Sequence, residues 1–281
     1  MSETAFKTVY REEFVAGYEE RESWLRKTCT TEASIKGNTA VFLVASSGTT
    51  PANAVTRGAN GLIPARADNN DQNSCTIVEW HDLVRKTGFT VDLSQGNQRQ
   101  IMQMTSMGVI NRKVDGDIIT TLAGATQDTG AAATASVAMV MKSLTILGNN
   151  FVGVEQEDKM WGLISNAFWA YMMQTTEFTS GDYVNVKAYD GTIKRTYRWA
   201  GVNWIRHPNI GGVGTAAEKC YLYHTDAIGH ACDKERVVSI PGYDDEQDYH
   251  WVRTSGWFGS TILQNTGIVE MVHDGSAYVA T

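Results

Sequence analysis

The chain of 281 residues is 42% hydrophobic and 20% charged, with 26 glycines and 4 prolines, which excludes disordered, collagen-like and low-complexity proteins. Its 24 Lys+Arg against 31 Asp+Glu give a net charge of -7, which argues against a protein that reads nucleic-acid sequence, because such proteins carry a basic surface. Four cysteines are too few for a disulfide scaffold and fit a reducing compartment. No signal peptide is recognisable, and the longest apolar run, 40–45, is far shorter than the ~20 residues of a membrane span. We therefore expect no membrane partner, and a protein that stays in the cell that makes it or in particles assembled there.

Aromatic residues spaced by four predict an amphipathic helix over residues 4–28. The repeating side chains are Phe6, Tyr10, Phe14 and Tyr18, with Trp24 further along, and charged residues lie between them. Two interpretations stay open. The helix packs on the core of its own chain, or it is an arm whose aromatic stripe lies on a neighbouring subunit.

Residues 33–92 predict an extended β-hairpin. A strand at Ala40–Ser46 precedes a long stretch rich in Gly, Asn, Asp, Ala and Ser, and a second strand follows at Cys75–Leu83. Loops longer than about 15 residues are uncommon inside compact domains and usually serve function or assembly.

Three helices are expected in the middle of the chain. The longest covers 94–123, contains no proline, and has Ser94 as its N-cap. The second covers Ser136–Leu147, and the third covers Asp158–Gln174 with a core face of large apolar side chains.

From Phe178 onward the pattern favours strands. The pair Asp190-Gly191 predicts a hairpin turn, and Lys219–His224 predicts a strand that runs into a short helix at Asp226–Cys232. The last 35 residues read as strands broken by glycines 256, 259 and 267. This order of elements indicates an α+β protein.

The best candidate for a metal site has the spacing C-x3-H-x5-H-x-C, and zinc prefers four such ligands in a tetrahedron. Its members are Cys220, His224, His230 and Cys232. On a strand, Cys220 and His224 would lie about 13 Å apart, so the chain would have to fold back sharply. Ordinary core or interface residues are the favoured interpretation, and a soluble α+β metalloenzyme is the alternative.

The remaining polar clusters predict no catalysis. The acidic run 244–248 lacks the glycine of a calcium loop, so a solvated turn is expected there. Asp115 and Asp117 would point in different directions from a helix and cannot form an acid/base pair, whereas Arg112 is placed for an ion pair with Asp115. No phosphate-loop, nucleophile-elbow or zinc-protease motif occurs. The sequence predicts neither a catalytic residue nor a cofactor.

The order of these elements resembles the tailed-bacteriophage major capsid proteins, which have the Hong Kong ninety-seven-type capsid fold. Five segments carry the resemblance. TRGANGLIP (56–64) is similar to the tip of the extended loop, and MGVINRKVDGDIITTLAGA (107–125) is similar to the spine helix. YRWAGVNWIRHPNI (197–210) and CYLYHTDAIGHA (220–231) are similar to motifs of the axial domain, and GWFGSTILQNTGIVEMV (256–272) is similar to the closing β segment. His230 departs from the aromatic or aliphatic residue expected at its position.

The resemblance implies an α+β fold with five parts. They are an N-terminal arm at 1–32, an extended β-hairpin loop at 33–92, a peripheral domain with the spine helix at 93–150, an axial domain at 151–240, and a closing β segment at 241–281. The loop-lysine cross-link known in this family is not expected, because the loop from Ser46 to Ser74 contains no lysine.

The resemblance also implies a structural subunit that assembles as hexamers and pentamers into an icosahedral head shell around double-stranded DNA. Partners would be other copies of the chain, a separate scaffolding protein, a portal and decoration proteins. Packaged DNA would be touched only non-specifically, and assembly would occur in the host bacterial cytoplasm before the protein is found in the virion. The alternative is an encapsulin-type cellular shell. The residues expected to contact neighbouring subunits are Tyr10, Phe14, Trp24, Arg57, Gly58, Gly61, Arg66, Arg112 and Asp115.

Overall fold

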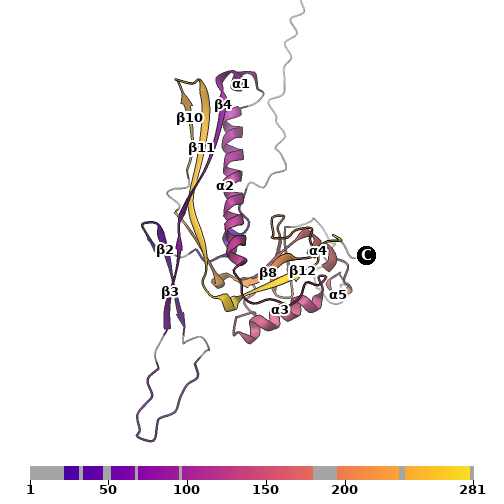
Figure 1. Cartoon of the computed structure of the whole chain (residues 1–281). Helices are drawn as coiled ribbons and strands as arrows, with labels where there is room; N and C mark the ends of the chain where they lie inside the picture. The colour runs from indigo at the N-terminus through magenta and orange to yellow at the C-terminus, as the bar shows by residue number, and fades with distance from the viewer. Residues whose placement is uncertain are drawn as a thin grey trace, which may run out of the picture. The chain divides into compact units, whose positions relative to one another are not determined.

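The computed structural model describes residues 22–31, 34–46, 52–66, 69–94, 97–179, 195–233 and 238–278. The chain divides into two compact units, each assembled from separate stretches of sequence. Unit 1 contains residues 22–24, 78–115 and 232–258 of the described chain, and unit 2 contains 25–77, 116–231 and 259–278. Helices and strands occur in both units, which confirms the expected α+β class (Figure 1).

Unit 1 is a long helix packed on one face of three antiparallel strands, which belong to a four-stranded sheet. The sheet has the order β10 (Val238–Asp244), β11 (Tyr249–Ile262), β4 (Val78–Thr87), and the helices are α1 (Gly88–Leu93) and α2 (Gln98–Leu122), of which residues up to 115 belong to this unit. Gly256 of β11 permits the close approach, because a β-carbon there would lie 3.1 Å from Ile110 of the helix. Lys113 covers the ring of Trp80 at 4.0 Å.

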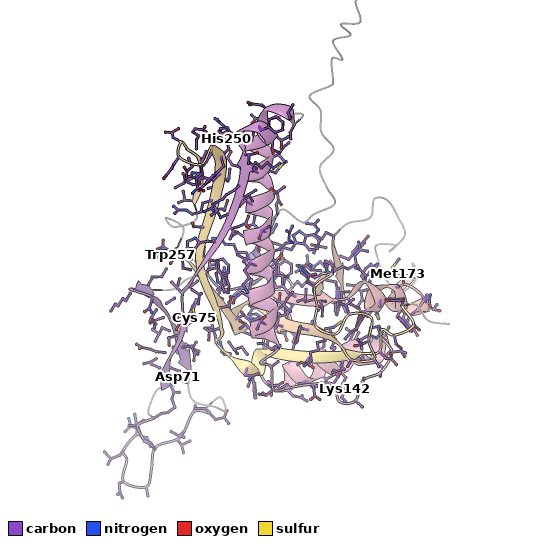
Figure 2. The ribbon with its side chains drawn as sticks, turned by 45° about the horizontal axis from the view of Figure 1, so that its top comes forward. Asp71, Cys75, Lys142, Met173, His250 and Trp257 are labelled. Carbon is purple, nitrogen blue, oxygen red and sulfur yellow. The ribbon has the colours of Figure 1, made fainter. Side chains whose placement is uncertain are left out.

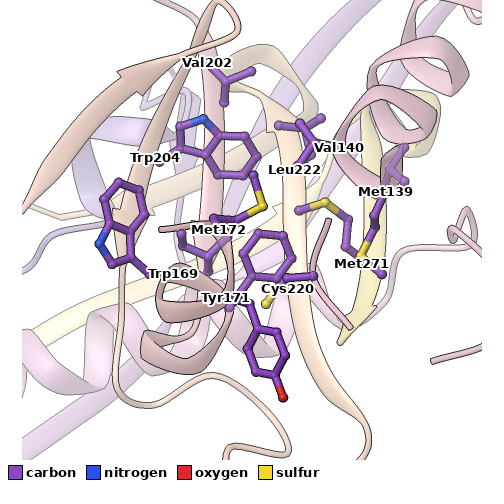
Figure 3. Close-up of a cluster of buried hydrophobic side chains, with 14 of the residues drawn as sticks. Met139, Val140, Trp169, Tyr171, Met172, Val202, Trp204, Cys220, Leu222 and Met271 are labelled. Carbon is purple, nitrogen blue, oxygen red and sulfur yellow. The ribbon is translucent and has the colours of Figure 1, made fainter. Parts of the chain in front are cut away.

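Unit 2 is built on a five-stranded sheet. Its strand order is β12 (Ile268–His273), β8 (Glu218–His224), β5 (Met160–Ile164), β7 (Val202–Arg206), β6 (Thr196–Trp199), and only β5 and β7 pair in parallel. The helices of this unit include α3 (Val137–Asn149), α4 (Asn166–Met172) and α5 (Thr176–Thr179). Side chains from α3, α4 and the sheet interlock in the core that Figure 3 shows, with Trp204, Cys220 and Leu222 among its buried members.

Unit 2 also holds a three-stranded antiparallel sheet of β1 (Ser34–Lys36), β2 (Thr39–Ser46) and β3 (Asn69–Thr76). The strand β9 (Ile228–Cys232) pairs with β11. The described residues also form short 3-10 helices at η1 (Arg26–Thr28), η2 (Thr225–Ala227) and η4 (Asn265–Gly267). Among the described helices none is long and apolar enough to cross a membrane.

The long helix, the second helix and the first strand of the hairpin are confirmed with shifted ends. The second strand of the hairpin is wrong, because β2 pairs with β3 (Asn69–Thr76), whereas most of the predicted strand 75–83 belongs to β4, which pairs with β11 in unit 1. The helix α2 begins at Gln98, and Ser94 is the C-cap of α1 rather than the N-cap of α2. Ser136 caps α3 as expected, since its hydroxyl accepts the backbone N–H of Met139.

Three further sequence predictions are wrong. Residues 158–174 form the strand β5 and the helix α4, separated at Ser165, whose hydroxyl accepts the N–H of Phe168 and starts the helix. The strand β5 is buried on both faces, so it lacks the alternation that identifies a strand. The expected helix at 226–232 is η2 followed by β9. Gly256 and Gly259 lie inside β11 and do not break it.

Two further predictions lie largely outside the described residues. Of the expected helix at 4–28, the described part from residue 22 contains only η1 and bends. The pair Asp190-Gly191 is not described, and the turn between β6 and β7 is made by Ala200 and Gly201, both at positive φ (52° and 74°). Two positive-φ residues suit the tight hairpin turns that match strand twist.

The core of unit 2 depends on a glycine at the centre of its sheet. A β-carbon on Gly162 of β5 would overlap the ring of Trp204 on β7, whereas one on Gly116 of α2 would meet no atom within 4 Å. We expect Gly162→Ala to lower the free energy of unfolding by about 1–3 kcal/mol through overpacking. The control Gly116→Ala should raise it by about 1 kcal/mol, because alanine favours a helix interior. Urea unfolding followed by circular dichroism measures both, and a Gly162→Ala variant as stable as the wild type would contradict the packing.

Candidate subunit-contact surface

The hairpin of β2 and β3 is fixed to unit 2 at its base. Ala40, Phe42 and Cys75 of the two strands form a buried cluster with Ala231 of β9, and Leu263 packs beside them. The pairing of β2 with β3 runs from Thr39 opposite Thr76 to Ser46 opposite Asn69 (Figure 2, where Asp71 and Cys75 mark β3). The base of the hairpin is therefore part of the core of unit 2.

Phe42 fixes the base of the hairpin by packing against Gly229. Its ring occupies the space where a β-carbon of Gly229 would be, at 2.7 Å from that position. The side-chain amide of Asn73 also donates to the carbonyl of Leu263 at 2.9 Å. On both strands, a side chain thus ties the hairpin to elements far away in the sequence.

Beyond this base the hairpin leaves apolar side chains in solvent. The side chain of Leu43 is 69% exposed, and Leu62 in the tip is 73% exposed. Val55 and Ile63 are exposed as well. Burying an exposed apolar side chain is favourable, and a full leucine side chain contributes about 1.5–3 kcal/mol of stabilisation. The outer hairpin therefore offers a surface that is stabilised only by a partner.

The tip folds into a compact turn. The N–H of Gly58 donates to the carbonyl of Leu62 at 3.0 Å, and the N–H of Gly61 donates to the carbonyl of Gly58 at 2.8 Å. Gly61 has φ +74°, which glycine adopts without strain. The Arg57 guanidinium donates to the carbonyl of Gly61 at 3.1 Å. Three of the residues expected at subunit contacts are thus brought together, and Arg66 is exposed in the same described segment, 52–66.

Asp115, a contact residue predicted on the long helix, is buried within its own unit. Asp115 is 1% exposed and accepts hydrogen bonds from the hydroxyl of Ser23 at 2.6 Å and from the N–H of Trp24 at 3.0 Å. These bonds fix the end of the N-terminal segment to the helix within unit 1. The ion pair expected between Arg112 and Asp115 stays a prediction. Tyr10 and Phe14 lie outside the described residues.

A hydrogen-bonded chain of Asp117, Ser260 and His230 escaped the sequence analysis. The hydroxyl of Ser260 donates to the carboxylate of Asp117 at 2.6 Å, and Nδ1 of His230 lies 2.9 Å from the same hydroxyl. The serine stands between the acid and the histidine, so its proton is held by the carboxylate and the order is not that of a hydrolase triad. A polar partner for His230 explains why a histidine replaces the apolar residue expected there.

The zinc interpretation has no support in the described part of the chain. There, no group of three or more His, Cys, Asp and Glu side chains is placed to hold a metal ion. Cys220 is fully buried in the core, and burial raises the pKa of its thiol to about 12, which disfavours the thiolate that binds zinc.

A second polar cluster is buried in unit 2 around Glu218 and His273. The Glu218 carboxylate accepts hydrogen bonds from the hydroxyl of Ser165 and from the N–H of Gly214, the latter at 2.8 Å. His273 Nδ1 accepts the N–H of Ala135 at 3.0 Å, and its Nε2 lies 3.9 Å from Glu218. Both side chains are completely buried. Burial lowers the pKa of His273 below its ordinary value, although the Glu218 carboxylate opposes the shift.

This lowered pKa predicts that unit 2 loses stability as the pH falls below about 6.5, the ordinary histidine value. In that range the unfolded chain binds a proton at residue 273 and the folded chain does not, so protonation favours unfolding. Above it the contribution is fully present. The variant His273→Asn keeps an acceptor near Nδ1 and removes the titration, so its stability should fall less between pH 7.5 and pH 5. Urea unfolding at several pH values measures this, and equal slopes for variant and wild type would contradict it.

Both the sequence and the fold of this chain match known proteins. A sequence profile described as "Phage capsid protein" matches residues 3–274. A solved structure from Mycobacterium phage Che8 matches with a TM-score of 0.70 at 13% identity, over 96% of this chain and 98% of that chain. The capsid of Cyanophage P-SCSP1u gives 0.68 at 12% identity, over 96% and 93%. The capsid of a native GTA particle gives 0.66 at 10% identity, over 98% and 99%.

No curated protein sequence matches the chain. The profile nevertheless spans almost all of it, and the solved capsids share its fold over nearly their whole length. The chain therefore belongs to the phage capsid protein family and has the Hong Kong ninety-seven-type α+β fold.

Proposed function

We propose that this major capsid protein builds the icosahedral head shell by laying the outer half of its β2–β3 hairpin, with the tip 52–66, on a neighbouring copy. One observation carries the proposal. The hairpin is anchored in the core at Phe42, yet it leaves Leu43 and Leu62 more than two-thirds exposed. A monomer gains nothing from such side chains, and a contact with the next subunit buries them.

The contact is heterologous, because the tip of one subunit meets a different surface on the next. Heterologous contacts close into rings when the rotation between subunits permits, which is how hexamers and pentamers form. Arg57 and Arg66 are the charged side chains of 52–66, so the accepting surface would be neutral or acidic. The other expected contacts, Tyr10, Phe14, Trp24 and Arg112, belong to the same proposal, as do the five domain boundaries. Asp115 is buried in its own subunit, so its proposed part is to hold the N-terminal segment through Ser23 and Trp24.

The finer partners are also proposed. A scaffolding protein, a portal and decoration proteins would act on the shell, and assembly would take place in the host bacterial cytoplasm. Packaged double-stranded DNA would make only non-specific contacts, because residues 151–281 contain 10 Lys+Arg and 16 Asp+Glu. Weak repulsion of this kind lets DNA move during packaging. The family match favours a phage head over an encapsulin shell or a metalloenzyme.

The tip provides a direct test. We expect Leu62→Ser combined with Ile63→Ser to leave the far-ultraviolet circular dichroism and the melting temperature of the subunit unchanged, because both side chains are exposed. The yield of closed shells should fall at least tenfold, because the partner loses two apolar contacts of about 1–2 kcal/mol each. Sedimentation and negative-stain microscopy measure the yield.

The matched control is Asn60→Ser, a polar exchange in the same exposed turn, which should assemble like the wild type. Shells formed at full yield by the double variant would overturn the role of the tip.

A further inference from the structure

Residues 127–135 run along the outer edge of the five-stranded sheet. The strand β12 is the edge strand there, and it pairs with β8 on its other side. The N–H of Thr129 donates to the carbonyl of Glu270, and the N–H of Asp274 donates to the carbonyl of Ala133, both at 3.0 Å. Proteins cover the edges of their sheets because an open edge strand can pair with another chain. The segment 127–135 is therefore a cover for this edge.

His273, the last residue of β12, holds the end of this segment. Its Nδ1 accepts the N–H of Ala135 at 3.0 Å, so the proton of the neutral ring lies on Nε2. The same Nδ1 lies 3.4 Å from the carbonyl oxygen of Ala133. One ring nitrogen thus faces both a backbone donor and a backbone acceptor. In this neutral form the nitrogen can bond only to the donor, whereas in the protonated ring it can bond only to the acceptor.

The other ring nitrogen lies close to a buried carboxylate. Nε2 of His273 has no hydrogen-bond partner among the described residues, and it lies 3.9 Å from a carboxylate oxygen of Glu218. Both side chains are completely buried. In the neutral ring the Nε2 proton is therefore a buried donor without an acceptor, which is unfavourable. A positively charged ring would be attracted to the carboxylate at this distance, because a protein interior screens charges weakly.

The titratable groups around the ring are two carboxylates and one phenol in the described part of the chain. Glu218 belongs to β8, Asp274 follows in the chain, and the ring of Tyr171 in α4 lies 5.0 Å from the imidazole. Burial lowers the pKa of His273 from its ordinary value, while the two carboxylates and the carbonyl of Ala133 oppose the shift. The ring is therefore neutral at pH 7, and it binds a proton only in more acidic solution.

We propose that His273 is a pH-dependent switch that releases Ala135 from the edge of the sheet when the ring binds a proton. In the neutral state Nδ1 holds the N–H of Ala135. In the protonated state Nδ1 donates to the carbonyl of Ala133 and Nε2 donates to Glu218. The N–H of Ala135 then loses its acceptor, because two donors cannot bond to each other. Ala135 directly precedes Ser136, which caps α3, so the start of that helix moves with it. The switch acts within one subunit and does not depend on the proposed shell function.

The amide of Ala135 reports the switch directly. Unassembled full-length subunits labelled with ¹⁵N are titrated from pH 7.5 to pH 5 and followed by nuclear magnetic resonance. We expect the amide proton of Ala135 to move to lower chemical shift as its hydrogen bond is lost, with the same midpoint as the ring nitrogens of His273. The control His273→Asn has no titrating ring, so its Ala135 amide should stay constant over this range. An Ala135 amide that stays constant while the wild-type ring binds its proton would overturn the switch, as would a ring that stays neutral until the subunit unfolds.

Glu218→Gln tests the partner on the other side of the ring. The carboxamide can still bond to Ser165 and Gly214, but it carries no charge. Without the carboxylate, the titration midpoint of His273 should fall by roughly one pH unit, because an opposite charge within about 4–6 Å favours the protonated form. Far-ultraviolet circular dichroism at pH 7.5 checks that the variant folds. An unchanged midpoint in the folded variant would show that Nε2 does not pair with Glu218 and would overturn the protonated arrangement.

Discussion

The packing of Phe42 against Gly229 is the contact on which the rest of the subunit depends. It fixes the base of a hairpin whose outer half has no core of its own. Ala40 and Phe42 are buried on one face of β2, while Leu43 on the other face is exposed. Because side chains alternate across a strand, one short strand both anchors the hairpin and presents an apolar surface for assembly. A β-carbon at residue 229 would displace Phe42 and with it the whole projection.

Buried polar groups give unit 2 a single arrangement. Glu218 is completely buried, is held by Ser165 and Gly214, and lies near His273. A buried carboxylate is costly unless it is hydrogen-bonded, so each group tolerates only the packing that supplies its partners. A shell subunit needs a single arrangement of this kind, because its contacts with neighbours depend on where surfaces such as the hairpin are placed.

Much of the element order could be predicted, because β2, α2, α3 and β8 each show a clear apolar pattern or a clear boundary. The strand β5 could not, because it is buried on both faces and joins α4 through the single residue Ser165. The strand β9 was wrongly predicted as a helix. It contains Gly229, which packs against the ring of Phe42 187 positions earlier in the chain, and no local sequence pattern encodes such a contact. The segment 56–64 was identified as the loop tip through its resemblance to the family, but the hydrogen-bonded turn between Gly58 and Leu62 was not predicted.

The central claim is that the hairpin is anchored at its base and buried by a neighbour at its tip. Hydrogen–deuterium exchange of unassembled subunits and of closed shells, read by mass spectrometry, tests it most directly. The account predicts that amides in residues 52–66 exchange at least tenfold more slowly in shells, while amides at the base, near Ala40 and Phe42, are equally protected in both states. Equal exchange of the tip in subunits and in shells would contradict it.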